Sequence, residues 1–148
     1  MANITIATAV NASVDDVWGL FCKINRYPKW DAFVNEVMSA SNPRLKAGSV
    51  YLERSGMQKS EWKVTVFDAP NRQVHVGRVG FMGEVTREFR VEPDGEGAVL
   101  RQTISFTIMP GFTRPFGWLA EELFVKRMVS KRLVQSGEGA RGLLAGGE

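Results

Sequence analysis

The sequence predicts one α+β domain in which a curved antiparallel sheet packs on a long C-terminal helix. Apolar and polar residues alternate from residue 49 to residue 108, and turn sequences interrupt the alternation, which indicates consecutive strands. Helical spacing replaces the alternation after Pro110. The length of 148 residues corresponds to one domain, 1–148, and is sufficient to bury a core without a disulfide or a metal.

The first forty residues predict one strand followed by two short helices. Residues 3–10 alternate and predict the strand. Ser13, with Asp16 three residues later, is typical of a helix start, because the serine hydroxyl accepts a free backbone N–H. Apolar residues at helical spacing place the first helix at 14–24. Pro28 opens a second short helix, which carries Trp30, Phe33 and Val37.

Five further strands are predicted to form a meander. Their expected ranges are 49–54, 61–67, 73–79, 84–91 and 99–108. The segments between them contain glycine, proline, asparagine and aspartate, which favour tight turns. Strands joined by such short connections are antiparallel, since parallel pairing needs a long crossover. Together with the first strand and the helices, this predicts a sheet of about six to seven strands.

The last helix is predicted from Pro115 to about residue 135. Its apolar stripe consists of Leu119, Leu123, Val125, Met128, Val129 and Leu133. Gly137, Gly139 and Gly142 each weaken a helix by roughly 1 kcal/mol relative to alanine, so the end beyond residue 135 is left open. This helix alone is long enough to cover the sheet. A curved sheet around one helix tends to leave a gap, where we expect the functional site.

Composition excludes several classes of protein. The single Cys22 excludes a disulfide framework, and the single His75 excludes paired-histidine metal sites, so neither a metal nor a cofactor is predicted. The net charge of +3 comes from scattered basic residues, which argues against nucleic-acid binding. No secretory signal and no apolar run of the length of a membrane span is present, so we expect a cytoplasmic protein without integral membrane association.

Several short motifs occur in an order that points to a known family. They are SVDDVW at 13–18, Tyr27-Pro28-x-Trp30, Gly48 before a strand, Pro70 in a turn, and PDGEG at 93–97. In this order the chain resembles the START / birch-pollen-allergen-like superfamily of helix-grip domains (SRPBCC), in particular its polyketide cyclase/dehydrase and lipid-transport branch. The resemblance covers nearly the whole chain, although the glycine-rich end departs from it.

The resemblance implies a long helix that packs across the sheet and encloses an apolar cavity. Members of the superfamily use this cavity for lipids, sterols, polyketides or other hydrophobic ligands. A minority are enzymes, chiefly aromatases and cyclases. The superfamily has no universal catalytic motif, so the resemblance assigns no catalytic residue to this chain.

Polar side chains occur on the apolar faces of two predicted strands. Arg87 shares a face with Phe89, and Gln102 shares one with Phe106. A buried charge is costly unless it is paired or hydrogen-bonded. Two interpretations stay open: a glutamate such as Glu61 pairs with Arg87, or Arg87 and Gln102 bind the carboxylate or oxygenated head of an apolar ligand.

The same alternation places four further polar side chains. Arg54 and Arg78 follow apolar residues on their strands, and we expect them to reach water at the strand ends. His75 lies opposite its apolar neighbours, which predicts a solvent-facing imidazole. Tyr51 also lies opposite its apolar neighbours. A one-residue shift in register would exchange the two faces.

The favoured function is non-enzymatic binding or transport of a hydrophobic small molecule in the gap between sheet and helix. The chain contains more aromatic side chains than a thin layer of sheet and helix needs, which favours this hypothesis. The predicted ligand-binding residues are Trp30, Phe33, Tyr51, Trp62, Arg87, Phe89, Gln102, Phe106, Leu119 and Leu123.

Two alternatives remain. The first is a cofactor-free cyclase or dehydratase acting on a polyketide-like substrate, with Arg87 or a tyrosine stabilising an enolate. The second is a protein-interaction module of the chaperone-activator or toxin-like type, with an apolar patch at 112–118. A homodimer is compatible with each hypothesis.

Overall fold

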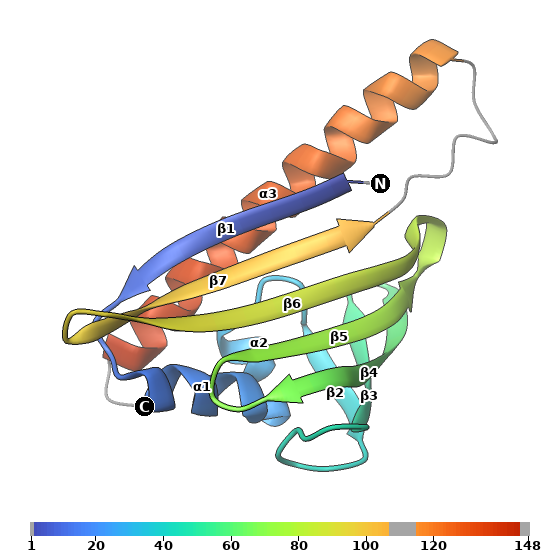
Figure 1. Ribbon diagram of the computed structural model, residues 1–148. Coiled ribbons are helices and arrows are strands. Elements are labelled where there is room, and N and C mark those ends of the chain that lie inside the picture. The colour runs from blue at the N-terminus through green and yellow to red at the C-terminus, as the bar shows by residue number, and fades with distance from the viewer. Residues whose placement is uncertain (1, 107–114, 146–148) are drawn as a thin grey trace.

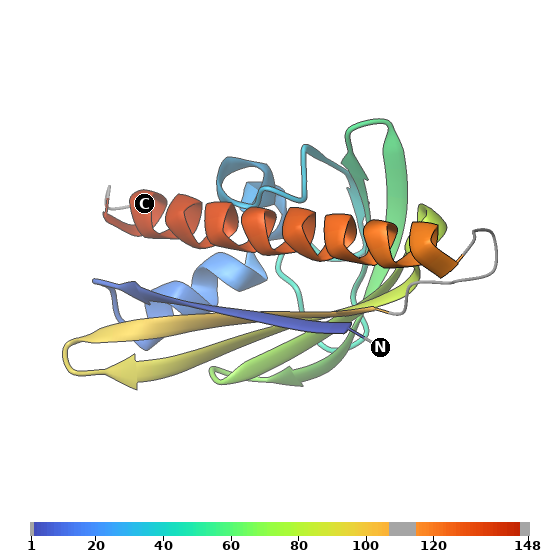
Figure 2. The same cartoon turned by 90° about the horizontal axis from the view of Figure 1, so that it is seen from above.

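A seven-stranded antiparallel sheet forms one layer of the molecule, and the helices lie together on one of its faces (Figures 1 and 2). The computed structural model describes residues 2–106 and 115–145, with the side chains of all of these except residues 81 and 115–122. Among these residues, no helix is both long and apolar enough to cross a membrane.

The strands follow the order β1-β7-β6-β5-β4-β3-β2 across the sheet. Their bounds are β1 Ala2–Val10, β2 Glu36–Ala40, β3 Val50–Ser55, β4 Gln58–Asp68, β5 Arg72–Val79, β6 Gly83–Asp94 and β7 Gly97–Phe106. β3 to β7 form the predicted meander, and β1 closes one edge by pairing with β7. The predicted α+β fold with a curved sheet is therefore confirmed.

The N-terminal helices are shorter than predicted. α1 spans Val14–Cys22, and the Ser13 hydroxyl accepts the Asp16 N–H at 3.1 Å, as expected. A 3-10 turn and the four-residue α2, Tyr27–Trp30, follow. The prediction that the second helix carries Phe33 and Val37 is wrong. Asp31 is extended and its carboxylate accepts the Phe33 N–H at 3.1 Å, so the chain leaves the helix and continues into β2.

The inner faces of β3 and β5 carry mainly polar residues, contrary to prediction. His75 is completely buried, so its predicted solvent-facing position is wrong. In the sheet His75 pairs with Arg87, and directly paired residues lie on the same face. The predicted apolar faces of β3 and β5 are therefore the outer ones. Arg54 and Arg78 lie on this outer side, and Arg54 pairs with Glu36.

α3 spans Pro115–Ala145, ten residues beyond the predicted end. It passes over the sheet as a separate layer (Figure 2). Two of its glycines lie where a side chain has no room. A Cβ at Gly139 would be 2.4 Å from the backbone oxygen of Trp30, and a Cβ at Gly137 would be 2.2 Å from Thr8 Oγ1. The glycines cost helix propensity but allow α3 to approach β1 and α2 closely.

This close approach predicts opposite effects for two glycine-to-alanine substitutions on α3. Gly139→Ala lowers the free energy of unfolding by about 1–3 kcal/mol, because the new Cβ meets backbone. Gly142→Ala, with no atom within 4 Å of its Cβ, raises it by up to about 1 kcal/mol. Urea denaturation of both variants measures the difference, and equal effects would contradict the close approach.

Candidate functional site

A cavity of about 240 Å³ lies between the sheet, the segment after α2, and α3. Most of its wall is apolar and includes four valines, two methionines, an isoleucine and three aromatic side chains. The lining residues are Phe33, Val34, Tyr51, Glu53, Ser55, Gln58, Ser60, Trp62, Val79, Met82, Val85, Arg87, Ile104, Met128, Val129 and Arg132.

The structure brings four of the predicted ligand-binding residues to this cavity. They are Phe33, Tyr51, Trp62 and Arg87. Trp30, Phe89, Gln102 and Phe106 are buried in the core and do not line it. Leu123 is 58% exposed and does not line it either. The side chain of Leu119 and the predicted patch at 112–118 lie outside the described residues.

A cluster of aromatic rings forms the part of the core that lies under α1 and α2. α1 and α2 fill one end of the space under α3 (Figure 1), where Phe21 stacks on Phe89 with ring centroids 4.5 Å apart and lies 5.6 Å from Trp30. Tyr27 packs on Trp30 and its hydroxyl donates to the Phe21 carbonyl at 2.5 Å. The remaining space lies toward β3, β4 and the middle of α3, which is where the cavity is found.

Arg87 forms a buried ion pair with Asp31 beside the cavity. Its Nη1 and Nη2 donate to the two carboxylate oxygens at 2.5 and 3.0 Å, and the side chains are 5% and 0% exposed. The guanidinium lies between the rings of Phe33 and Phe89, 4.9 and 4.7 Å from their centroids. The predicted carboxylate partner is thus Asp31 and not Glu61. Asp31 follows α2 and shows no sequence periodicity, so alternation gave no signal for it.

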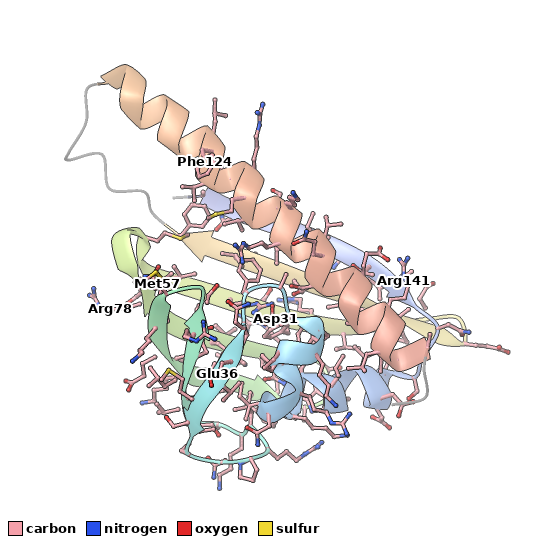
Figure 3. The ribbon with its side chains drawn as sticks, turned by 180° about the vertical axis from the view of Figure 1, so that it is seen from behind. Asp31, Glu36, Met57, Arg78, Phe124 and Arg141 are labelled. Atoms are coloured by element: carbon pink, nitrogen blue, oxygen red, sulfur yellow. The ribbon has the colours of Figure 1, made fainter. Side chains whose placement is uncertain are left out.

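The ion pair connects elements that are far apart in the sequence. Asp31 also accepts the Ser136 hydroxyl of α3 at 3.0 Å. Arg87 Nη2 also donates to Gln102 Oε1 of β7 at 3.0 Å, and Gln102 Nε2 donates to the Leu133 carbonyl of α3. Figure 3 shows Asp31 in the interior beside α3, whereas Arg78 and Phe124 lie at the periphery. Because Asp31 balances its charge, Arg87 is not a free cation in the cavity.

A chain of hydrogen bonds runs behind the cavity wall along β3 and β5. The Tyr51 hydroxyl lies 2.6 Å from His75 Nδ1, and His75 Nε2 lies 2.9 Å from Gln73 Oε1. Burial, reinforced by Arg87, lowers the pKa of His75 to about 3, so the imidazole is neutral. Gln73 Nε2 donates to Cys22 Sγ, so Gln73 Oε1 accepts from His75 Nε2–H. His75 Nδ1 then accepts from Tyr51.

Glu53 places a buried carboxyl group in the cavity wall. It lies on the inner face of β3 and is 4% exposed. Trp62 Nε1 donates to its Oε1 at 3.0 Å, whereas its Oε2 has no hydrogen-bond partner. Burial raises the pKa of Glu53 to about 7, and Asp31 adds to this, while the Trp62 hydrogen bond and Arg87 oppose it. Sequence analysis missed Glu53, although it lies two residues from Tyr51 on the same strand face.

Gly77 on β5 positions Trp62. The two residues are directly paired across β4 and β5. A Cβ at residue 77 would be 2.5 Å from the Trp62 ring, so the indole lies over the strand only because residue 77 is glycine. Among the described residues, no group of three carboxylate, histidine or cysteine side chains is arranged to hold a metal ion.

Comparison with known proteins gives a family and a fold. The family profile described as "Polyketide cyclase / dehydrase and lipid transport" matches residues 1–136. No curated protein matches the sequence significantly. Many solved structures share the fold at low identity, among them the following three.

The protein XoxI from Bacillus cereus has a TM-score of 0.75 at 12% identity, covering 97% of this chain and 95% of its own. The protein MLL2253 from Mesorhizobium loti has a TM-score of 0.75 at 11% identity, covering 99% of each chain. StfQ, a di-domain ARO/CYC from the steffimycin biosynthetic pathway, has a TM-score of 0.73 at 15% identity, covering 95% of this chain and 49% of its own.

The buried ion pair predicts strong coupling between Asp31 and Arg87. Asp31→Asn or Arg87→Leu alone lowers the free energy of unfolding by about 3–5 kcal/mol, because each leaves a buried charge without its partner. The double variant Asp31→Leu/Arg87→Leu loses less free energy of unfolding than the two single variants Asp31→Leu and Arg87→Leu lose together. As a control, Arg54→Ala at the exposed pair with Glu36 changes stability by at most about 1 kcal/mol. Additive effects in urea denaturation would contradict the coupling.

The raised pKa of Glu53 predicts a pH-dependent loss of stability. The pKa of Glu53 is about 7 in the folded state and near 4.5 in the unfolded state. Between these two pH values the folded state therefore binds more protons than the unfolded state does. The free energy of unfolding therefore falls as the pH rises from about 4.5 to 7, by an amount on the order of 3 kcal/mol. His75 acts in the opposite direction between about pH 3 and 6.5, because only the unfolded state takes up a proton there.

Glu53→Gln separates the two contributions. The variant keeps the contribution of His75 and loses that of Glu53. Its stability relative to the wild type therefore increases as the pH rises through the interval from 4.5 to 7. Urea denaturation of both proteins across this interval measures the difference. A difference that stays constant with pH would show that Glu53 titrates normally in the folded protein.

Proposed function

Since the chain belongs to the polyketide cyclase / dehydrase and lipid transport family, we propose that it binds a hydrophobic small molecule in the cavity between the sheet and α3. The observation that carries the proposal is the cavity itself. Valine, isoleucine, methionine and aromatic side chains form most of its wall, and a few polar groups are placed among them. This is the usual composition of a small-molecule site.

The size of the cavity supports a ligand of one or two rings. An apolar protein cavity of about 150 Å³ accommodates benzene. The volume here is about 240 Å³, which suits a somewhat larger guest. Burial of such a guest stabilises the complex through the apolar area removed from water. We therefore propose a compact, largely apolar ligand.

The second candidate is a cofactor-free cyclase or dehydratase that uses the same cavity. Glu53 favours it, because a buried carboxyl group with a pKa of about 7 is suited to proton transfer near neutral pH. StfQ, with its aromatase/cyclase description, also supports it through the shared fold. Turnover of a polyketide-like substrate that is lost in Glu53→Gln would favour catalysis over binding alone.

A cavity-filling variant tests the binding proposal. Val85 lines the cavity on β6, so Val85→Phe places a ring in the space and weakens binding of naphthalene by about tenfold or more. Val76→Phe on β5, whose side chain lies on the outer face, leaves binding unchanged. Fluorescence titration measures the affinities, and thermal unfolding verifies that both variants fold.

Two outcomes would contradict the proposal. Naphthalene and larger apolar probes would not bind the wild-type protein, or Val85→Phe would bind naphthalene as well as the wild type does. Native mass spectrometry of the protein purified from its own host extends the test. A co-purifying small molecule that Val85→Phe no longer retains would give the chemical class of the ligand.

A further inference from the structure

We propose that Glu53 is the polar anchor of the cavity and binds an uncharged oxygen group of the ligand, a hydroxyl group when the carboxyl is ionised and a carbonyl group when it is protonated. The inference rests on the proposed function, because it concerns recognition within the same cavity. It adds the class of ligand: an apolar ring system carrying a hydroxyl or keto group.

The geometry of Glu53 leaves one oxygen for a ligand. The residue lines the cavity and is 4% exposed. Its Oε1 accepts the Trp62 indole N–H at 3.0 Å, and its Oε2 is buried without a partner. A buried polar atom without a hydrogen bond is costly, and such atoms are rare in folded proteins. A ligand in the cavity supplies the missing partner.

Trp62 determines which oxygen stays available. An indole nitrogen only donates, so it requires an acceptor and holds Oε1 in that role. The indole itself is held over β5 because Gly77 has no side chain to displace it. The carboxyl group is thus oriented by the protein before a ligand enters.

The charges around Glu53 argue for an uncharged ligand group. Arg87 of β6 is paired with Asp31, which follows α2. Arg132 of α3 lies in the cavity wall and donates to the Ala32 carbonyl at 2.9 Å. A cationic head group would meet the Arg132 guanidinium, and an anionic one would meet the ionised Glu53.

The remaining titratable groups near Glu53 stay neutral. Tyr51 lies beside it on β3, and burial raises the pKa of its phenol well above 10. His75 of β5 bonds to Tyr51 and has a pKa of about 3. Among the described residues that line the cavity, Glu53 is therefore the group that changes charge near neutral pH, with a pKa of about 7. The same atom, Oε2, is an acceptor above this pH and carries the donor below it.

Three probes of similar shape test the inference: 2-naphthol offers a hydroxyl group, 2-tetralone a keto group, and naphthalene neither. Between about pH 5.5 and 8, 2-naphthol binding tightens by about fivefold, since an ionised acceptor is stronger. Over the same range 2-tetralone binding weakens by about tenfold, because its oxygen loses a donor. Naphthalene binding stays constant. Fluorescence or calorimetric titration measures all three.

Glu53→Gln provides the decisive variant. Trp62 needs an acceptor, so the amide oxygen takes that role and the amide nitrogen faces the ligand as a permanent donor. We expect 2-tetralone to bind this variant independently of pH, with the affinity that the wild type shows at low pH. The pH dependence of 2-naphthol binding disappears. The matched control, Glu36→Gln on the exposed side of β2, binds all probes as the wild type does.

The outcomes separate this inference from the proposed function. If none of the three probes and no larger apolar probe binds at either pH, the proposed function fails and the anchor fails with it. If all three probes bind the wild type with affinities that do not depend on pH, the anchor is overturned and the binding cavity stands. Should Glu53→Gln not fold, carbon NMR of Glu53 in the wild type gives a second test: 2-naphthol lowers its pKa and 2-tetralone raises it. No shift with either ligand overturns the anchor.

Discussion

The packing of the interior depends on the buried ion pair between Asp31 and Arg87. It lies where β6, β7, α3 and the segment after α2 meet, and each of these elements contributes a hydrogen bond to it. Removing two charges from water is expensive, so the pair is tolerable only with both partners and their further bonds in place. The attraction between the two charges and the hydrogen bonds from Gln102 and Ser136 offset this cost. Because Ser136 belongs to α3, the same bonds tie α3 to the sheet beside the cavity.

Sequence periodicity predicted the positions of β3 to β7 well, but it assigned the wrong inner face to β3 and β5. Alternation located β3 to β7 because successive residues of a strand point to opposite faces, whatever those faces contact. On β3 and β5 it did not tell which face is inside. On β5 the inner side chains are Gln73 and His75, next to Gly77, whereas Val74 and Val76 lie on the outer face. The usual assumption that the more apolar face is buried fails here because the interior holds a hydrogen-bonded polar chain.

The candidate site was partly predictable from residue type and strand position. Trp62 and Arg87 share a strand face with apolar residues and line the cavity. Phe33 and Tyr51 line it too, although alternation and helical spacing had placed them differently. Trp30 and Phe89 also point inward, but α1 and α2 fill their end of the space, which depends on packing between distant segments. Asp31 follows a four-residue helix and has no periodicity to reveal it. The glycines of α3 weakened the helix in isolation, whereas the folded protein uses them for close packing.

Gly77 illustrates how a residue outside the cavity wall determines the positions of side chains that line it. It is not a lining residue, yet its missing side chain decides where the Trp62 indole rests. The indole in turn decides which oxygen of Glu53 is occupied. A methyl group at position 77 would thus displace the indole and change the orientation of the Glu53 carboxyl group, although residue 77 does not line the cavity. Redesign of the cavity would therefore begin at this position of β5, with the packing of the indole ring against the strand.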